Sequence, residues 1–138
     1  MMSNCIFCKI INGEIPSATV YEDEYFKAIL DISPAAKGHV LILPKHHSDD
    51  LLELDSDSAA RVLMVAQKIA KAQMEELKCD GINMLQNNGE AAGQTVKHFH
   101  IHLIPRFNGD KVDIKWSQGS YESGEAAQLA EKINKRIN

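Results

Sequence analysis

Three histidines alternate with apolar residues in one short run, and this run constrains the fold more than any other feature of the sequence. The run reads His98-Phe99-His100-Ile101-His102. Because alternate side chains of a β-strand share a face, we expect the three imidazoles on one side and the apolar side chains in a core on the other. Residues two apart along a strand are about 6–7 Å apart, so one anion can meet more than one imidazole. Imidazole is a nucleophile near neutral pH and can also act as an acid.

Apolar periodicity along the rest of the chain predicts an α+β fold. Strands are expected over residues 18–21, 25–31, 39–43, 82–86 and 99–104, with Pro44 and Pro105 ending two of them. A short helix is expected over 5–12, a long one from a cap at Ser56 or Asp57 to the turn at Asp80-Gly81, and a last one over 125–137. Hairpin-like strand pairs without β-α-β alternation favour an antiparallel sheet of about five strands with one long central helix and a C-terminal helix.

The length and charge of the chain limit its organisation and its partners. With 138 residues, we expect one domain over 1–138, with a motif-bearing core at about 5–106 and a C-terminal extension over 107–138. The net charge of −4 argues against binding long nucleic acid, which requires a basic stripe. No targeting segment and no apolar run of membrane-spanning length are visible, so we expect a cytoplasmic protein without a membrane partner.

A polar loop precedes the histidine run and looks suited to an anion. Residues 87–95 supply glycines for close backbone approach, amides and a hydroxyl. Two other interpretations of the histidines are a solvated strand face and a three-histidine metal site. No acidic Mg²⁺ cluster and no Gly-x-x-x-x-Gly-Lys loop is present, so we expect no catalytic metal.

The sequence resembles the histidine triad (HIT) family. His98 to Ile104 matches the family's histidine-φ-histidine-φ-histidine-φ-φ signature, and the similarity extends over roughly residues 5–106. It includes the segments Asp31-Ile32-Ser33-Pro34, Gly38 to Lys45 and Gly93-Gln94-Thr95-Val96. The resemblance implies the HIT-like fold, a purine nucleotide substrate and a homodimer.

The resemblance also implies roles for individual residues. His100 would be the nucleophile, and its tautomer would be fixed by the main chain of His98 and by His39. His102 would contact the phosphate, and Asp31 would bind the ribose hydroxyls with Ile32 near the base. The phosphate side and leaving group would be contacted by Asn87, Gly93, Gln94 and Thr95. The implied reaction is hydrolysis of a nucleoside phosphoramidate or dinucleoside polyphosphate through a covalent nucleotidyl-histidine, with release of a nucleoside monophosphate.

Cys5-x-x-Cys8 is a candidate metal motif. The chain has three cysteines, an odd number that argues against a disulfide framework, and the pair spacing suits two zinc ligands or a redox dithiol. The resemblance to zinc-bearing HIT proteins implies that His47 and His98 complete one structural zinc site per chain, with His46 as an alternative ligand.

Other functions remain open at this point. The same His100 intermediate would allow nucleotidyl transfer to a second phosphate, although transferase relatives end the motif with glutamine where this chain has His102. A nucleotide-binding regulatory protein with incidental catalysis is another class, and a redox protein built on Cys5 and Cys8 is a third. Trp116, in a segment 112–116 with plausible strand alternation, either shapes substrate choice or packs in an interface.

Overall fold

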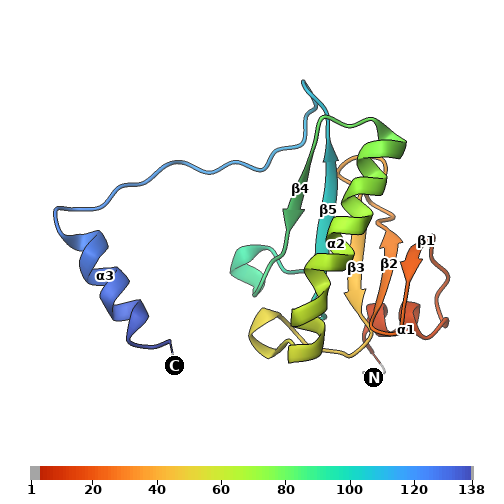
Figure 1. Cartoon of the computed structure of the whole chain (residues 1–138), viewed down its shortest axis with the longest axis horizontal. Helices are drawn as coiled ribbons and strands as arrows, with labels where there is room; N and C mark the ends of the chain where they lie inside the picture. The colour runs from red at the N-terminus through yellow and green to blue at the C-terminus, as the bar shows by residue number, and fades with distance from the viewer. Residues whose placement is uncertain (1–3, 138) are drawn as a thin grey trace.

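The computed structural model describes residues 4–137 and has the predicted α+β architecture (Figure 1). All neighbouring strands are antiparallel, and the sheet order is β1-β2-β3-β5-β4. The strands are β1 (Thr19–Glu22), β2 (Phe26–Leu30), β3 (Val40–Pro44), β4 (Gly81–Leu85) and β5 (Ile101–Arg106). The α-helices are α1 (Ile6–Ile11), α2 (Ser56–Leu77) and α3 (Glu125–Asn134), and short 3₁₀ turns lie at Leu51–Glu53 and Glu90–Ala92.

Strand β3 ends at Pro44 as predicted, whereas Pro105, also expected to end a strand, lies inside one. Pro44 is the last residue of β3, and Pro105 pairs with Ile82 inside β5. The pairing of β3 with β5 ends at Leu103, so at Pro105 strand β5 has only β4 as a neighbour. A proline, which has no N–H to donate, is tolerated on such an unpaired strand edge. β5 also begins at Ile101, later than predicted.

One further prediction on local structure was wrong. The cap of α2 is Asp55, whose carboxylate accepts from the Ser58 N–H at 3.0 Å, because the chain becomes helical one residue earlier than expected. Residues 112–116, where strand alternation is plausible, form no strand because they leave the sheet instead of pairing with it, and Trp116 is 81% exposed.

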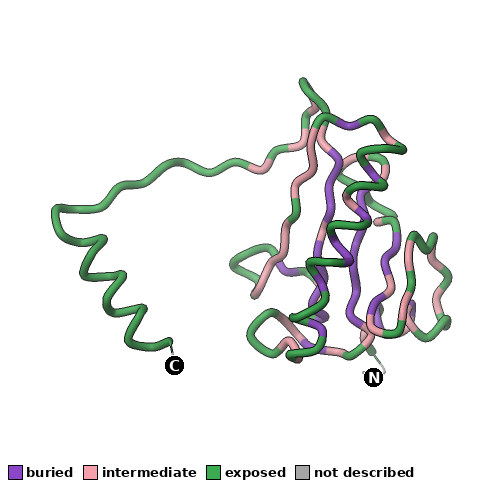
Figure 2. Tube along the Cα trace, viewed as in Figure 1, coloured by how far each residue is buried: buried purple, intermediate pink, exposed green. Residues whose placement is uncertain are grey.

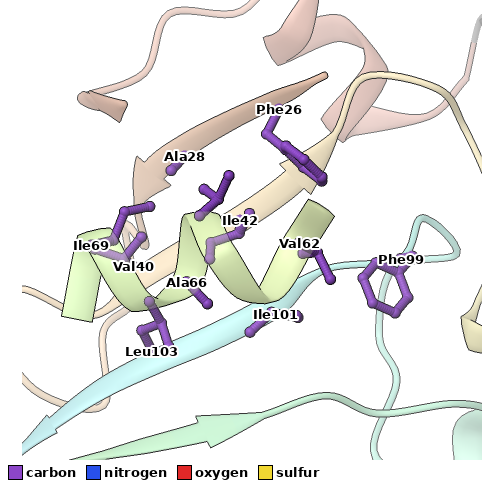
Figure 3. Close-up of a cluster of buried hydrophobic side chains, with 11 residues drawn as sticks. Phe26, Ala28, Val40, Ile42, Val62, Ala66, Ile69, Phe99, Ile101 and Leu103 are labelled. Carbon is purple, nitrogen blue, oxygen red and sulfur yellow. The ribbon is translucent and has the colours of Figure 1, made fainter. Parts of the chain in front are cut away.

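The main core lies between α2 and one face of the sheet (Figure 3). Alternate residues of three strands face the apolar side of α2, and the buried set is Phe26, Ala28, Val40, Ile42, Val62, Val65, Ala66, Ile69, Phe99, Ile101 and Leu103. The intervening residues Ile29, Leu41 and Leu43 form a second cluster on the opposite face with Phe7 and Ile10 of α1. The sheet is therefore covered by α2 on one face and by α1 on the other.

The predicted alternation of the histidine run is confirmed by these clusters. Phe99, Ile101 and Leu103 pack under α2, while His98 and His100 contact Phe7 of α1 on the other face. The site thus lies on the α1 side of the sheet. Beyond β5 the chain extends away from the sheet, and every residue from 115 to 137 is exposed (Figure 2). Within residues 4–137, no helix combines the length and the apolar character needed to cross a membrane.

Ile42 tests the main core, because its side chain is fully buried between β3 and α2. We expect Ile42→Ala to lower the free energy of unfolding by about 2–5 kcal/mol, through lost burial and the cavity left behind. Leu52, which is 87% exposed, is the matched control, and Leu52→Ala should change the value by less than about 0.5 kcal/mol. Urea unfolding followed by circular dichroism measures both, and equal effects would contradict the packing described above.

Candidate active site and metal centre

His100 is held as a neutral imidazole with one defined tautomer. Its Nδ1 lies 2.7 Å from the carbonyl oxygen of His98, and a carbonyl only accepts, so Nδ1 carries the proton. The lone pair is therefore on Nε2. Burial lowers the pKa of His100, and the edge of Phe7 packs against the ring with centroids 5.0 Å apart. The result is a positioned nitrogen lone pair that could act as a nucleophile without deprotonation near neutral pH.

His39 fixes the tautomer of His102, and not that of His100 as the resemblance implied. The backbone N–H of Ala35 donates to His39 Nδ1 at 3.0 Å, so the proton of His39 is on Nε2. That Nε2 lies 2.9 Å from His102 Nδ1, which must accept. His102 therefore carries its proton on Nε2. The difference arises because β3 and β5 are neighbours, with Leu41 opposite His102, which brings the start of β3 to the third histidine of the run.

A cavity of about 280 Å³ lies beside these rings, on the α1 side of the sheet. Its wall is built from α1, the end of β2 and the loop before the histidine run, and includes Ile6, Ile10, Asp31, Ile32, Thr95, Val96, His100 and His102. The wall is mostly apolar with a few polar groups at one end, the usual character of a small-molecule site.

Asp31 and Ile32 lie at the end of β2 as predicted. One Asp31 oxygen accepts from the Ser33 N–H at 2.9 Å, and the other is 3.8 Å from His39 Nε2. Ile32 is 94% exposed at the rim of the cavity. The carboxylate of Asp31 is thus oriented by the turn that follows it, and Ile32 offers apolar surface to a ligand in the cavity.

The loop before the run is ordered by its own amides. Gln94 is buried, with its Nε2 donating to the carbonyls of Asp49 and Val96 and its Oε1 accepting from the Gly89 N–H. Because these bonds use the whole amide, Gln94 shapes the loop rather than offering a free donor to a phosphate.

Asn87, Gly93 and Thr95 complete this loop. The Asn87 amide donates to the Gly93 carbonyl at 3.5 Å, and Gly93 adopts a φ of +95° that side chains rarely accept. Thr95 lies on the cavity wall. The structure therefore brings Thr95 to the histidines, while Asn87 and Gly93 fix the loop around it.

A second group of four side chains meets next to the histidine run. Cys5 and Cys8 of the α1 segment, His47 after β3, and His98 offer one ligand atom each, all within 4.8 Å of one another. His98 Nδ1 lies 3.4 Å from Cys5 Sγ, 3.6 Å from Cys8 Sγ and 3.1 Å from His47 Nδ1. The ambiguity between the adjacent histidines is thus resolved by geometry, because His47 belongs to the cluster and His46 is exposed outside it.

In this cluster the imidazole protons of the two histidines point outward, so their lone pairs face the centre. His98 Nε2 donates to the Pro44 carbonyl at 2.8 Å, and His47 Nε2 donates to Asp49 at 3.0 Å, so both Nδ1 atoms carry lone pairs. Burial lowers the pKa of His98 to about 4, which keeps the ring neutral. Two unprotonated nitrogens beside two sulfurs form a donor set that could hold a metal cation. Tetrahedral zinc at its usual bond lengths separates N and S ligands by about 3.3–3.8 Å, close to the distances here.

Sequence reasoning missed the groups that orient the histidines. Phe7 packs against two of the rings, and the Ala35 N–H and the Pro44 carbonyl set the tautomers of His39 and His98. Backbone groups carry no signal in residue identity, and Phe7 looked like any apolar residue of a short helix. Only the packing of α1 on the sheet brings it to the histidines.

The titration of His102 should make the free energy of unfolding depend on pH. Burial, with charge from His100 and His39 when they are protonated, lowers the pKa of His102 to about 4. In the unfolded chain the His102 imidazole takes up a proton near pH 6.5, whereas in the folded chain it stays neutral until about pH 4. The stability that the neutral imidazole contributes is therefore fully present above about pH 6.5 and is lost as the pH falls toward 4. An NMR titration should place the His102 pKa well below 6.5. The free energy of unfolding should decrease less between pH 7 and pH 5 in His102→Gln than in the wild type. A His102 pKa at or above 6.5 would contradict the buried, neutral imidazole described here.

Comparison with known proteins matches this geometry to one family. A HIT domain model matches residues 12–109. Protein hit of Bacillus subtilis is 44% identical over 97% of this chain and 94% of its own length. Adenosine 5′-monophosphoramidase hnt1 of Schizosaccharomyces pombe is 38% identical over 97% of this chain and 98% of its own.

Solved structures agree in fold. A Streptococcus mutans protein matches with a TM-score of 0.95 at 48% identity, covering 100% of this chain and 88% of that one. A HIT family protein of Bacillus subtilis matches at 0.94 with 43% identity and 99% of both chains. A zinc-bound histidine triad protein of Mycobacterium smegmatis matches at 0.76 with 42% identity, over 96% of this chain and 98% of that one. With the family model, the full-length relatives and the triad geometry in agreement, this chain belongs to the HIT family.

Proposed function

We propose that this protein is a nucleotide hydrolase that attacks the α-phosphate of a purine nucleoside phosphoramidate or dinucleoside polyphosphate, with His100 as the nucleophile. The observation that carries the proposal is the free lone pair on His100 Nε2, set by the 2.7 Å bond from Nδ1 to the His98 carbonyl, at the wall of a cavity. Relatives from Schizosaccharomyces pombe and Saccharomyces cerevisiae, 38% and 47% identical, are adenosine 5′-monophosphoramidases and support the substrate class.

The cavity suits a nucleotide in one orientation. The base would lie against the apolar residues of α1 and Ile32, and Asp31 would accept hydrogen bonds from the ribose hydroxyls. The α-phosphate would then lie at the polar end, where the Nε2–H of His102 donates to a phosphate oxygen and Thr95 lies close by. Donors aimed at the phosphate oxygens stabilise charge that develops there in the transition state.

The proposed reaction is a double displacement. Nε2 of His100 attacks phosphorus, the Nε2–P bond forms, and the bond from phosphorus to the leaving nitrogen or oxygen breaks. The leaving group keeps that electron pair and takes up a proton. Water then attacks phosphorus, the Nε2–P bond breaks, and a nucleoside monophosphate and a proton are released. Two easier steps replace one difficult hydrolysis.

Removing the nucleophile tests the proposal. His100→Ala should lower AMP release from adenosine 5′-phosphoramidate by more than about 10³-fold, because the covalent route is lost. His46→Ala is the matched control, since His46 is exposed outside the site, and it should keep wild-type turnover. Diadenosine polyphosphates assayed in parallel identify the preferred leaving group.

Mass spectrometry after an alkaline quench detects the intermediate. A nucleotidyl adduct on a peptide containing His100 is expected in the wild type and not in His100→Ala. Equal turnover by the variant would remove His100 as nucleophile, and tight nucleotide binding without turnover by the wild type would favour a regulatory binding protein.

We also propose that Cys5, Cys8, His47 and His98 hold one structural zinc per chain. Support comes from the four inward lone pairs, their spacing, and the zinc-bound relative from Mycobacterium smegmatis. Bound zinc would neutralise the two thiolates and link α1 to the start of the histidine run. All four positions are taken by protein ligands, which is the pattern of a structural site.

The zinc proposal predicts a stoichiometry and a loss of stability. Protein purified without chelator should contain one zinc per chain by atomic absorption, and Cys8→Ser should lose it and unfold at a lower temperature. Cys79 is buried away from the cluster, so Cys79→Ala should keep the metal. Substoichiometric zinc in the wild type after careful reconstitution would overturn the proposal.

A further inference from the structure

The apolar face that α2 turns toward the sheet ends in a buried glutamine. Gln73 follows Ile69 at the next helical turn, and it is only 6% exposed. The preceding residues of this face are apolar and belong to the main core: Val62, Val65, Ala66 and Ile69. Burying a polar side chain costs free energy unless hydrogen bonds compensate for the lost water. The hydrogen bonds of Gln73 therefore have to account for its place in this interface.

The amide of Gln73 links two separate segments of backbone. Its Nε2 donates to the carbonyl of Gly38 at 2.9 Å and to the carbonyl of Leu103 at 3.1 Å. An amide nitrogen carries two protons, so these bonds use both of them. Its Oε1 is buried and meets no donor among residues 4–137. A buried acceptor without a protein donor is costly, so the link between the two carbonyls is what the glutamine adds at this position.

The two carbonyls flank the histidine pair at the end of the site. Gly38 directly precedes His39, and Leu103 directly follows His102. The imidazoles of His39 and His102 meet at 2.9 Å on the α1 side of the sheet. Helix α2 covers the other side (Figure 1). The α2 amide thus holds, from behind the sheet, the two backbone segments that carry this pair.

His39 lies beyond the end of the pairing between β3 and β5. The paired residues end at Val40 and Leu103, one position short of His39. The backbone N–H of His39 donates to Ala36, and its carbonyl accepts from Asp31, so these bonds join it to its own loop and to the end of β2. The strand pairing alone therefore does not fix His39 against β5, and the α2 amide spans this end of the ladder.

The backbone of Gly38 is also fitted closely against α2. Its φ is +94°, and a Cβ added there would overlap the side chain of Leu77. Leu77 follows Gln73 by one helical turn. The same end of α2 thus holds Gly38 by a hydrogen bond and by a packing contact.

We propose that Gln73 is a positioning residue, whose amide fixes the backbone on both sides of the His39–His102 pair and so keeps the Nε2–H of His102 directed into the cavity. While His39 Nε2 donates to His102 Nδ1, the proton of His102 stays on Nε2. The inference rests on the proposed function, in which this proton is donated to the α-phosphate. Gln73 acts through the two histidines, because it lies on the α2 side of the sheet and is not part of the cavity wall.

NMR of protein labelled with ¹⁵N-histidine tests the contact directly. The wild type should show a through-hydrogen-bond N–N coupling between His39 Nε2 and His102 Nδ1, with His102 in one tautomer. Gln73→Met keeps the length of the side chain and removes the donors, so it should lose the coupling and give a mixture of His102 tautomers. Gln73→Asn keeps an amide but is one carbon too short to reach both carbonyls. It should show the same loss, and it keeps the test decisive if the methionine variant does not fold.

Ile69→Val is the matched control for a general loss of stability. Ile69 is buried on the same face of α2, one turn before Gln73, and has no hydrogen bond to either carbonyl. We expect Ile69→Val to lower the melting temperature and to keep the N–N coupling. A coupling that survives in both Gln73 variants, that is lost equally in Ile69→Val, or that is absent from the wild type would overturn the proposal.

Steady-state kinetics separate this role from the hydrolase proposal itself. Gln73→Met should lower kcat for adenosine 5′-phosphoramidate by at least about tenfold, because a misdirected donor weakens stabilisation of the transition state. KM should change by less than about twofold, since the wall proposed to bind the base is formed by α1 and Ile32. A wild-type kcat in a variant that has lost the coupling would overturn the positioning role. A wild-type protein without turnover would overturn the hydrolase proposal instead, because the coupling is measured without any hydrolysis.

Discussion

The site depends on one buried histidine that serves two centres. His98 has no exposed surface; its ring contributes Nδ1 to the cysteine–histidine cluster, and its carbonyl accepts the proton of His100 Nδ1. The Pro44 carbonyl holds the other side of the ring. Because one residue fixes both the candidate metal site and the tautomer of the proposed nucleophile, displacement of its ring would disturb both at once. A metal-ligating histidine is normally oriented by a hydrogen bond from its other ring nitrogen, as His98 is by the Pro44 carbonyl.

Helix α1 extends this coupling to the cavity. The segment carries Cys5 and Cys8 on one side, while Ile6 and Ile10 line the cavity and Phe7 packs on His98 and His100. A helix of six residues is too short to be stable alone, so its position depends on the packing of Phe7 and Ile10 and on the cysteines. A metal in the cluster would therefore stabilise the position of α1, the cavity wall against which we propose that the nucleotide base packs.

The contrast between β5 and the chain after it shows why some predictions succeeded. Alternation in the histidine run placed Phe99, Ile101 and Leu103 under α2 because burial selects one face of a strand. Strand-like alternation is also plausible over 112–116, but that segment forms no strand, since alternation cannot show whether a neighbouring strand is available for pairing. The family resemblance implied a substrate contact for Gln94, but the hydrogen bonds of the folded loop use its amide.

Residue identity and order by themselves determined the α+β class, the face on which the histidines lie, the long central helix and the cysteine pair, because these follow from local periodicity and side-chain chemistry. Only the tertiary structure decided that His47 rather than His46 joins the cluster, that His39 bonds to His102, and that α3 leaves its own core. The histidine contacts depend on the register of β3 against β5, which brings together residues far apart in the chain. The path of the chain toward α3 depends on the hydrogen bonds from Arg106 to Asp110 and to the Val112 carbonyl.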